Sequence, residues 1–489
     1  MSDLSQGGGN KINDPNGLSL PHLIAAVIAA VVGGGVFTMA GDMAAAGANT
    51  GAVLIGWLLC GIGVFCLMMC FFGLSRYKPE LTGGIFAYAR AGFGKFLGFI
   101  SVYGYWVSCL LATVSYTALM FSSLAYFFPV FGEGNNLPSV IGASIITWIC
   151  WALVVRGVKV AATVNILTTI SKVVPLFVAI VAIILSMHFD PAVFMDNFWG
   201  EPDGLPLWDQ ILGVVGVSIW IFLGIEGAIA ISGRAKYSKD VGRATIIAFC
   251  GILATYLLVS ILSMGIMPRA ELAELANPSM AGVLEACVGP WGGALISLGV
   301  ALSLLGSMLG YTILSSEVSF EAAEQGAFPK AFAKLSKTGG PLVTCTVSCA
   351  IVQLFLIVQL FSEQTYQFFY SVSVSMILVP YFFATLFALV CAVKKDGYAN
   401  ASSKMVWFYR VAGLIGFLYS VFLVYAGGMQ GLMITTILFA PGIILYAVGE
   451  KQRGEAVLPK AIDKVVAAAI VVFFVVSIVL IATGQISVI

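Results

Sequence analysis

Long apolar segments alternate with short polar connections along almost the whole chain. A helix needs roughly 20 apolar residues to cross the hydrocarbon core of a bilayer, and most of these segments reach that length. The pattern predicts an all-α integral membrane protein with about thirteen transmembrane helices and no extramembrane domain. The predicted spans are residues 18–46, 49–75, 94–129, 138–155, 160–187, 207–233, 241–268, 290–322, 341–361, 364–393, 405–426, 430–449 and 464–485.

Two of these spans carry glycines in their middle, where a membrane helix needs good helix formers. The first contains the run VVGGGVF at 31–37, and the sixth contains WIFLGIEG at 220–227. Three consecutive glycines should interrupt a helix, and backbone interrupted at membrane depth must line a protein-enclosed cavity or hold a ligand. Alternatively, the glycines only allow helices to pack closely.

Paired interruptions in corresponding halves of a chain are a pointer to the substrate site of transporters with inverted repeats. The second half-helix offers free N–H groups and a positive dipole end to an anion. The first half-helix offers free carbonyls, which suit an ammonium group. We therefore expect the interruptions to bind a zwitterion, namely an α-amino acid.

Composition narrows the class further. The chain has 489 residues, of which 60% are hydrophobic and only 10% charged, and its mean hydropathy is +1.02. A soluble protein of this size needs more charged surface, so the protein should face the lipid bilayer. The net charge of +1 and the lack of a long basic run give no sign of nucleic-acid binding, so we expect no nucleic acid as a partner.

Motifs of catalysis and metal binding are missing from the sequence. There is no metalloprotease His-Glu pair, nucleophile elbow or phosphate-binding loop, and the cysteines lack metal-ligand spacing. We therefore expect neither an enzyme nor an ATP-driven pump, and no catalytic residue, metal or cofactor.

The positive charges predict the orientation. All 24 Lys and Arg residues except Lys172 and Arg269 fall on the N-terminal side of the predicted topology. By the positive-inside rule the N-terminus is cytoplasmic, and an odd number of spans places the C-terminus outside. We expect a multi-pass protein of the cell (inner) membrane.

Charged and polar residues inside the spans are the candidates for function. Glu226 is the strongest, because a carboxylate near mid-membrane is costly; it couples the gate or merely steadies the interrupted helix by a hydrogen bond. Lys172 fills the place of a coupling ion or snorkels to the interface. Polar stripes at helical spacing follow the third and eighth spans, where they line a cavity or join helices; they are Tyr105, Cys109, Thr113 and Tyr116, and Ser303, Ser307 and Tyr311.

Several motifs resemble the amino acid–polyamine–organocation superfamily, specifically its basic amino acid/polyamine antiporters. They are VVGGGVF, WIFLGIEG, GGIFAYARAGFGKFLGF at 83–99, LLGSMLGYTILSSEVSFEAAEQGAFPKAFAK at 304–334 and SVSVSMILVPY at 371–381. The similarity covers roughly residues 18–450. The segment SGRAKYSKDVGRAT and the additional C-terminal span look most like the arginine/ornithine antiporters.

This resemblance implies a leucine-transporter-type fold, a 5+5 inverted repeat with broken helices 1 and 6. Residues 1–17 would form a cytoplasmic tail and 18–393 a ten-helix transport core, with repeats at 18–187 and 207–393. Residues 405–489 would form accessory transmembrane helices 11–13. Relatives often dimerise, so the resemblance allows a homodimer.

The resemblance also implies roles for individual residues. The substrate carboxylate would meet backbone N–H groups of the first interruption, where Gly34 replaces the family's usual serine. Trp220 would cover the substrate, and Tyr311 stands where the arginine/agmatine exchanger has a tryptophan. Leu223 and Gly224 would offer carbonyls to the amine, and Glu226 would couple the gate, with Lys172 filling an ion site. The substrate-binding residues implied are Val31, Gly33, Gly34, Gly35, Ser108, Cys109, Thr113, Tyr116, Trp220, Leu223, Gly224, Tyr311 and Ser373.

The expected function is secondary active exchange of a basic amino acid for a related amino acid or amine by alternating access. Arginine against ornithine is the favoured pair. Lysine/cadaverine, ornithine/putrescine and histidine/histamine exchange remain alternatives, as does proton-coupled amino-acid uptake. Outside transport by a carrier, an amino-acid sensor in the membrane and a passive channel remain open.

Overall fold

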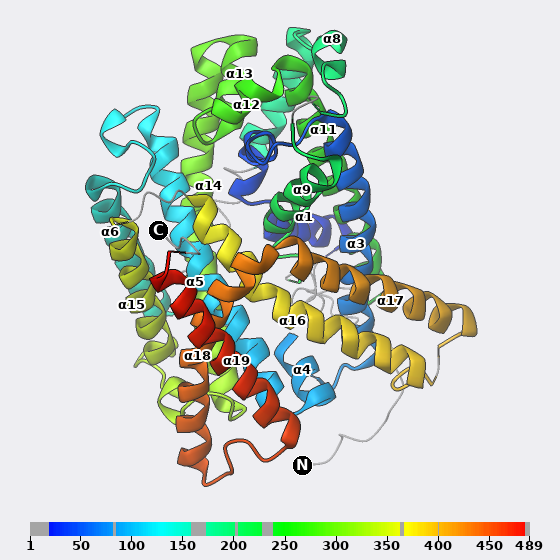
Figure 1. Ribbon diagram of the computed structural model, residues 1–489, viewed down its shortest axis with the longest axis vertical. Coiled ribbons are helices and arrows are strands. Elements are labelled where there is room, and N and C mark those ends of the chain that lie inside the picture. Colours follow the sequence, from blue (N-terminus) through cyan, green and yellow to red (C-terminus); the bar gives the residue numbers. More distant parts are fainter. Residues whose placement is uncertain are drawn as a thin grey trace.

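The computed structural model describes residues 19–81, 85–157, 173–200, 204–226, 238–361, 366–399 and 401–484, and every regular element of this part is a helix. The helices form one bundle (Figure 1). The 3₁₀ segments of this part are η1 (Gly34–Phe37), η2 (Pro129–Phe131) and η4 (Lys330–Ala333). The labelled α-helices are α1 (Leu20–Val31), α2 (Met39–Ala45), α3 (Thr50–Tyr77), α4 (Ile85–Phe93), α5 (Lys95–Ala125), α6 (Leu137–Arg156), α8 (Pro191–Met195), α9 (Leu207–Ile221), α11 (Ser238–Ile266), α12 (Arg269–Glu274), α13 (Ser279–Val288), α14 (Pro290–Glu324), α15 (Leu342–Gln359), α16 (Tyr366–Lys394), α17 (Ser403–Ala426), α18 (Gly428–Arg453) and α19 (Ala461–Ala482). A further helix, Val173–Ser186, precedes α8.

Ten helices of the described part are long and apolar enough to cross a membrane, so a multi-pass membrane protein is confirmed. They match ten of the thirteen predicted spans. Of the other three, span 18–46 is divided into α1, η1 and α2, and span 207–233 contains the shorter helix α9. Span 160–187 lies partly outside the described residues, which include its helix Val173–Ser186.

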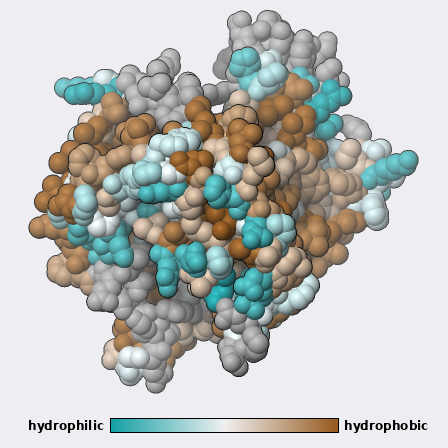
Figure 2. Space-filling view, turned by 90° about the horizontal axis from the view of Figure 1, so that it is seen from above, coloured by the Kyte–Doolittle hydropathy of each residue, from teal (hydrophilic) through white to brown (hydrophobic). Residues whose placement is uncertain are grey.

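Burial separates the centre of the bundle from its periphery. The apolar stretch of α5 is completely buried, whereas only 11% of that of α19 is buried, although α19 is the more hydrophobic of the two. A helix with apolar side chains all round and few protein neighbours must meet lipid. Figure 2, which views the bundle from above, shows hydrophobic residues around the sides and hydrophilic ones gathered towards the middle of the face.

Helix α5 is the central helix of the bundle, and it packs most extensively against α14 and α16. The short helices α8, α12 and α13 lie at the upper end in Figure 1, where α12 and α13 contact α2. The other end carries α4 and the connection between α18 and α19. The interrupted segment α1–η1–α2 packs against α9, α11, α12, α13 and α14.

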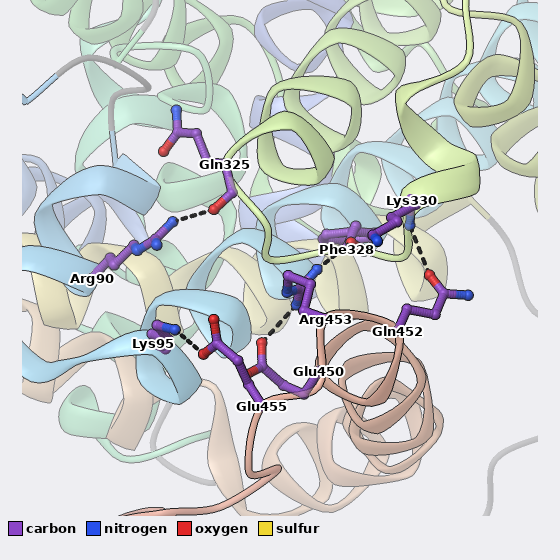
Figure 3. A network of polar contacts seen from close by, with 9 residues as sticks. All are labelled: Arg90, Lys95, Gln325, Phe328, Lys330, Glu450, Gln452, Arg453 and Glu455. Carbon is purple, nitrogen blue, oxygen red and sulfur yellow. Dashed lines mark hydrogen bonds and ion pairs between the residues drawn. The ribbon is translucent and has the colours of Figure 1, made fainter.

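A polar network at this lower end joins α18 and the segment after it to α5 and to the α14–η4 connection, which in turn binds α4 (Figure 3). Its strongest part is the pair Arg453–Glu450, at 2.6 Å, in which the Glu450 side chain is only 2% exposed. Lys95 pairs with Glu455, where both side chains are nearly half exposed, and lowers the pKa of Glu455. The remaining contacts of the network are Arg90 Nη1 to Gln325 O, Arg453 Nη1 to Phe328 O and Lys330 N to Gln452 Oε1.

Arg453→Gln should destabilise the protein by about 3 kcal/mol, because it leaves the buried Glu450 carboxylate without its cation. The measurement is the free energy of unfolding, or the melting temperature, of the purified protein in detergent. Lys95→Gln is the matched control, since an exposed pair contributes little. Equal melting temperatures for wild type and Arg453→Gln would contradict this prediction.

Candidate functional site

The first interruption begins where α1 ends at Val31. Val32 makes the last helical hydrogen bond, to Ile28, and Gly33 is extended. The chain then enters the 3₁₀ segment η1, whose first N–H groups lack intrahelical partners. Among the hydrogen bonds between described residues, none uses the N–H of Gly33 or Gly34. The predicted break in the first span is therefore present, and it presents unused backbone donors.

The second interruption follows α9, which ends at Ile221. The chain continues as a turn through Glu226, in which Gly224 has a φ of +98°. This left-handed region strains any residue with a Cβ, so the glycine is needed here. The carbonyl of Ile221 accepts a hydrogen bond from the Tyr256 hydroxyl of α11, at 3.1 Å. The helix thus stops at the predicted position, and Gly227 lies outside the described residues.

The two interruptions pack directly against each other. A Cβ built on Gly35 would lie 2.6 Å from Ile221 Cγ2 and 2.9 Å from Trp220 Cδ1. A Cβ on Gly34 would lie 2.6 Å from Leu304 Cδ2 of α14. Close packing, the alternative to ligand binding, therefore accounts for two of the three glycines, and no serine fits at Gly34 unless Leu304 moves.

Gly33 differs from its two neighbours. A Cβ there would meet only the Tyr116 hydroxyl, at 4.0 Å, and its extended backbone suits any residue. Neither packing nor backbone conformation therefore explains the third glycine. Gly33 marks a position where the backbone faces open space beside α5.

Aromatic rings from four helices, α5, α9, α14 and α16, gather beside Gly33. Trp220 of α9 stacks on Tyr370 of α16, with centroids 5.1 Å apart and planes at 21°, and it contacts Tyr116 of α5 at 5.2 Å. Tyr311 of α14 meets Tyr116 edge-on at 5.1 Å. The Trp220 Nε1 donor is buried and has no acceptor within the described part of the chain. The structure thus brings together Gly33, Tyr116, Trp220 and Tyr311, four of the residues that the sequence analysis names for the substrate site.

Tyr370 is the member of this group that sequence reasoning missed. A signal was present, since Tyr366, Tyr370 and Ser373 follow i, i+4, i+7 spacing on one face of α16. Aromatic residues are so frequent in the apolar spans that this spacing alone did not single it out.

Glu226 lies beside the aromatic group and joins three elements. Its Oε1 accepts a hydrogen bond from Tyr105 of α5 at 3.0 Å, and its Oε2 accepts one from Tyr381 of α16 at 2.5 Å. Both tyrosines are buried. The carboxylate therefore links the turn after α9 to two helices of the bundle, which is compatible with both predicted roles, coupling and structural support.

The hydroxyl and thiol residues predicted to line the site, Ser108, Cys109, Thr113 and Ser373, lie on α5 and α16. Ser373 donates to the Ser108 carbonyl at 2.8 Å, and the two hydroxyls lie 3.0 Å apart. Thr113 donates to the Cys109 carbonyl within α5. These groups join α5 to α16 or bond within their own helix, as expected for polar residues at helix–helix contacts. Lys172 lies outside the described residues.

The fold and the site together define a multi-pass helical membrane protein in which two interrupted helices meet beside a cluster of aromatic residues and one carboxylate. The chain belongs to the amino acid permease family, whose sequence profile matches residues 18–443.

Relatives with similar sequences match most of the chain. It is 40% identical to an arginine/ornithine antiporter of Pseudomonas aeruginosa over 463 residues, which is 93% of this chain and 95% of the relative. It is 37% identical to a putative arginine/ornithine antiporter of Escherichia coli over 89% of this chain and 93% of the relative. It is 38% identical to an arginine/agmatine antiporter of Chlamydia abortus over 87% of this chain and 89% of the relative.

Proposed function

We propose that this protein exchanges arginine for ornithine across a membrane by alternating access. The observation that carries the proposal is the opposed pair of interruptions, whose unused N–H groups and aromatic wall suit an amino acid with a cationic side chain. The similarity to an arginine/ornithine antiporter over 93% of the chain supports the same pair of substrates.

In this proposal the N–H groups of Gly33 and Gly34 bind the substrate carboxylate at a helix start. The backbone carbonyls of Leu223 and Gly224, in the turn after α9, accept from the α-ammonium group. The faces of Trp220 and Tyr116 cover the side chain, since cations favour aromatic faces. Val31, Gly35, Ser108, Cys109, Thr113, Tyr311 and Ser373 complete the surroundings of the site.

Glu226 and its two tyrosines couple substrate binding to movement of the helices. They do so because their hydrogen bonds connect the turn after α9 with α5 and α16. Exchange requires that the empty carrier reorients more slowly than the loaded one. Substrate contacts that offset the closure of the interrupted helices produce this difference.

We further propose the topology. Residues 18–187 and 207–393 form two inverted repeats, 405–489 form accessory helices, and the N-terminus is cytoplasmic with the C-terminus outside the inner membrane. The distribution of Lys and Arg supports this orientation. Lys172 occupies the place of a coupling ion.

The test is uptake of labelled arginine into proteoliposomes preloaded with ornithine, agmatine, lysine, histamine or nothing. We expect rapid uptake against internal ornithine and background uptake into empty vesicles. Uptake into empty vesicles under an imposed proton gradient would show a proton-coupled carrier instead. Faster uptake against agmatine than against ornithine would reassign the counter-substrate.

A further inference from the structure

Asp42 is a buried carboxylate outside the site described above. It lies in α2, beyond the first interruption, and is 4% exposed. The Tyr366 hydroxyl of α16 lies within hydrogen-bond distance of both carboxylate oxygens, and Gln367 Nε2 donates to Oδ1 at 2.7 Å. The contact joins the half-helix after the interruption to α16.

The partners of this carboxylate are neutral. None of the ion pairs in the described part of the chain includes Asp42, and the Tyr366 phenol and the Gln367 amide that donate to it carry no charge. A carboxylate taken out of water costs several kcal/mol unless a cation or good donors compensate it, and inside a membrane such a group indicates function by default. Asp42 is therefore a place where a cation would be stabilised.

Asp42 is also linked to the candidate site through two tyrosines of α16. Tyr366 packs on Tyr370 with centroids 5.6 Å apart, and Tyr370 stacks on Trp220 at 5.1 Å. Seven positions separate Asp42 from Gly35, which at roughly 1.5–2 Å per residue is on the order of 10 Å. The tyrosine pair thus connects the carboxylate to Trp220 beside the interruptions.

The two sides of the Asp42 contact are held by different parts of the bundle. On one side, Gly41 N donates to the Ser279 hydroxyl of α13, which in turn donates to the Thr38 carbonyl. On the other side, the Ser115 hydroxyl of α5 donates to the Tyr366 carbonyl. If α2 and α16 separate, each keeps its own anchor, and the side-chain contacts of Asp42 are the ones that break.

We infer that Asp42 is a second recognition site, which selects substrates by the positive charge of their side chain before they reach the interruptions. When α2 parts from α16, the guanidinium or ammonium group replaces the Tyr366 and Gln367 donors at the carboxylate. A guanidinium can donate two parallel hydrogen bonds to a carboxylate. The inference rests on the proposed exchange of basic amino acids and on the proposed orientation, which makes α2 face outward.

Asp42→Asn tests the inference, because it keeps the shape and removes the charge. Citrulline is the matched ligand, since an uncharged urea replaces the guanidinium of arginine. In proteoliposomes loaded with unlabelled arginine, we expect the KM for external labelled arginine to rise roughly tenfold or more, the range of a charge-assisted hydrogen bond. Citrulline should compete with labelled arginine equally well in both proteins. Its inhibition constant, calculated from the concentration that halves uptake and the KM for arginine, should be the same for Asp42→Asn as for wild type.

Three control variants separate a selective site from a structural contact. Asp42→Glu should restore most of the preference for arginine over citrulline. Tyr366→Phe removes the shared hydrogen bond but keeps the charge, so it should retain that preference even if turnover falls. Asp209→Asn, an exposed acid at the start of α9, should leave the preference unchanged.

The ratio of the two affinities does not depend on how much protein folds, so a lower yield of Asp42→Asn leaves the test valid. If arginine and citrulline weaken by the same factor, Asp42 is only a contact between α2 and α16 and the inference is wrong. If the wild-type protein exchanges arginine normally and Asp42→Asn still prefers arginine over citrulline, only this inference is wrong. Wild-type protein that does not exchange arginine overturns the proposed function as well.

Discussion

Gly35→Ala should reduce exchange to a few per cent of wild type or less. The new methyl group would lie 2.6 Å from Ile221 Cγ2 and 2.9 Å from Trp220 Cδ1, so the two interruptions would have to move apart. Overpacking of this kind costs about 1–3 kcal/mol, which corresponds to roughly 5- to 150-fold in an equilibrium. Because the displaced groups form the candidate site, we place the effect near the upper end.

The measurement is the initial rate of labelled arginine uptake into ornithine-loaded proteoliposomes, normalised to the amount of reconstituted protein. Gly216→Ala is the matched control: it lies in α9 itself, and a Cβ there would meet nothing within 4 Å. The control should exchange at the wild-type rate. Wild-type exchange by Gly35→Ala would show that the interruptions do not need their close contact.

Glu226→Gln should slow exchange by roughly 5- to 150-fold, mainly through turnover. The Tyr105 and Tyr381 hydroxyls each donate to one carboxylate oxygen, and an amide offers only one oxygen. One buried tyrosine donor would therefore face an NH₂ group, at a cost of about 1–3 kcal/mol. Glu226→Ala removes both acceptors and should abolish exchange.

KM and turnover for arginine should be determined separately for this variant. Glu324→Gln, at the exposed end of α14, is the control and should behave as wild type. Tyr381→Phe should fall between wild type and Glu226→Gln, because it removes one of the two hydrogen bonds. Wild-type turnover in Glu226→Gln would refute a coupling role for the carboxylate and leave only a supporting one.

Much of the site could be predicted because its most informative residues break local rules. Three glycines in an apolar span, and a carboxylate beside a glycine, can be recognised from the sequence without knowing what they contact. Each is energetically unfavourable in a membrane helix, whatever its neighbours are. The aromatic residues Trp220, Tyr116 and Tyr311 needed the family motifs, because tyrosine and tryptophan are common in membrane helices for other reasons.

The remainder depends on contacts between distant parts of the chain. Tyr381 is 155 positions from Glu226, and Tyr366 is 324 positions from Asp42. The pattern of residues within one helix does not predict which residues of another helix they contact. The same holds for Ser108 and Ser373. The sequence predicts that their hydroxyls line the substrate pocket, and in the structure they form hydrogen bonds between α5 and α16.

The sequence by itself therefore determined that the chain is embedded in a membrane, where two of its helices stop, and that a carboxylate stands at the second stop. These properties follow from hydropathy and backbone propensity, which act over one or two helical turns. Only the tertiary structure decided that Gly34 and Gly35 are packed while Gly33 is open, that Tyr370 completes the aromatic wall and that Asp42 is buried against α16. Those outcomes depend on how helices far apart in the chain fit together, because packing is set by the shapes of both partners.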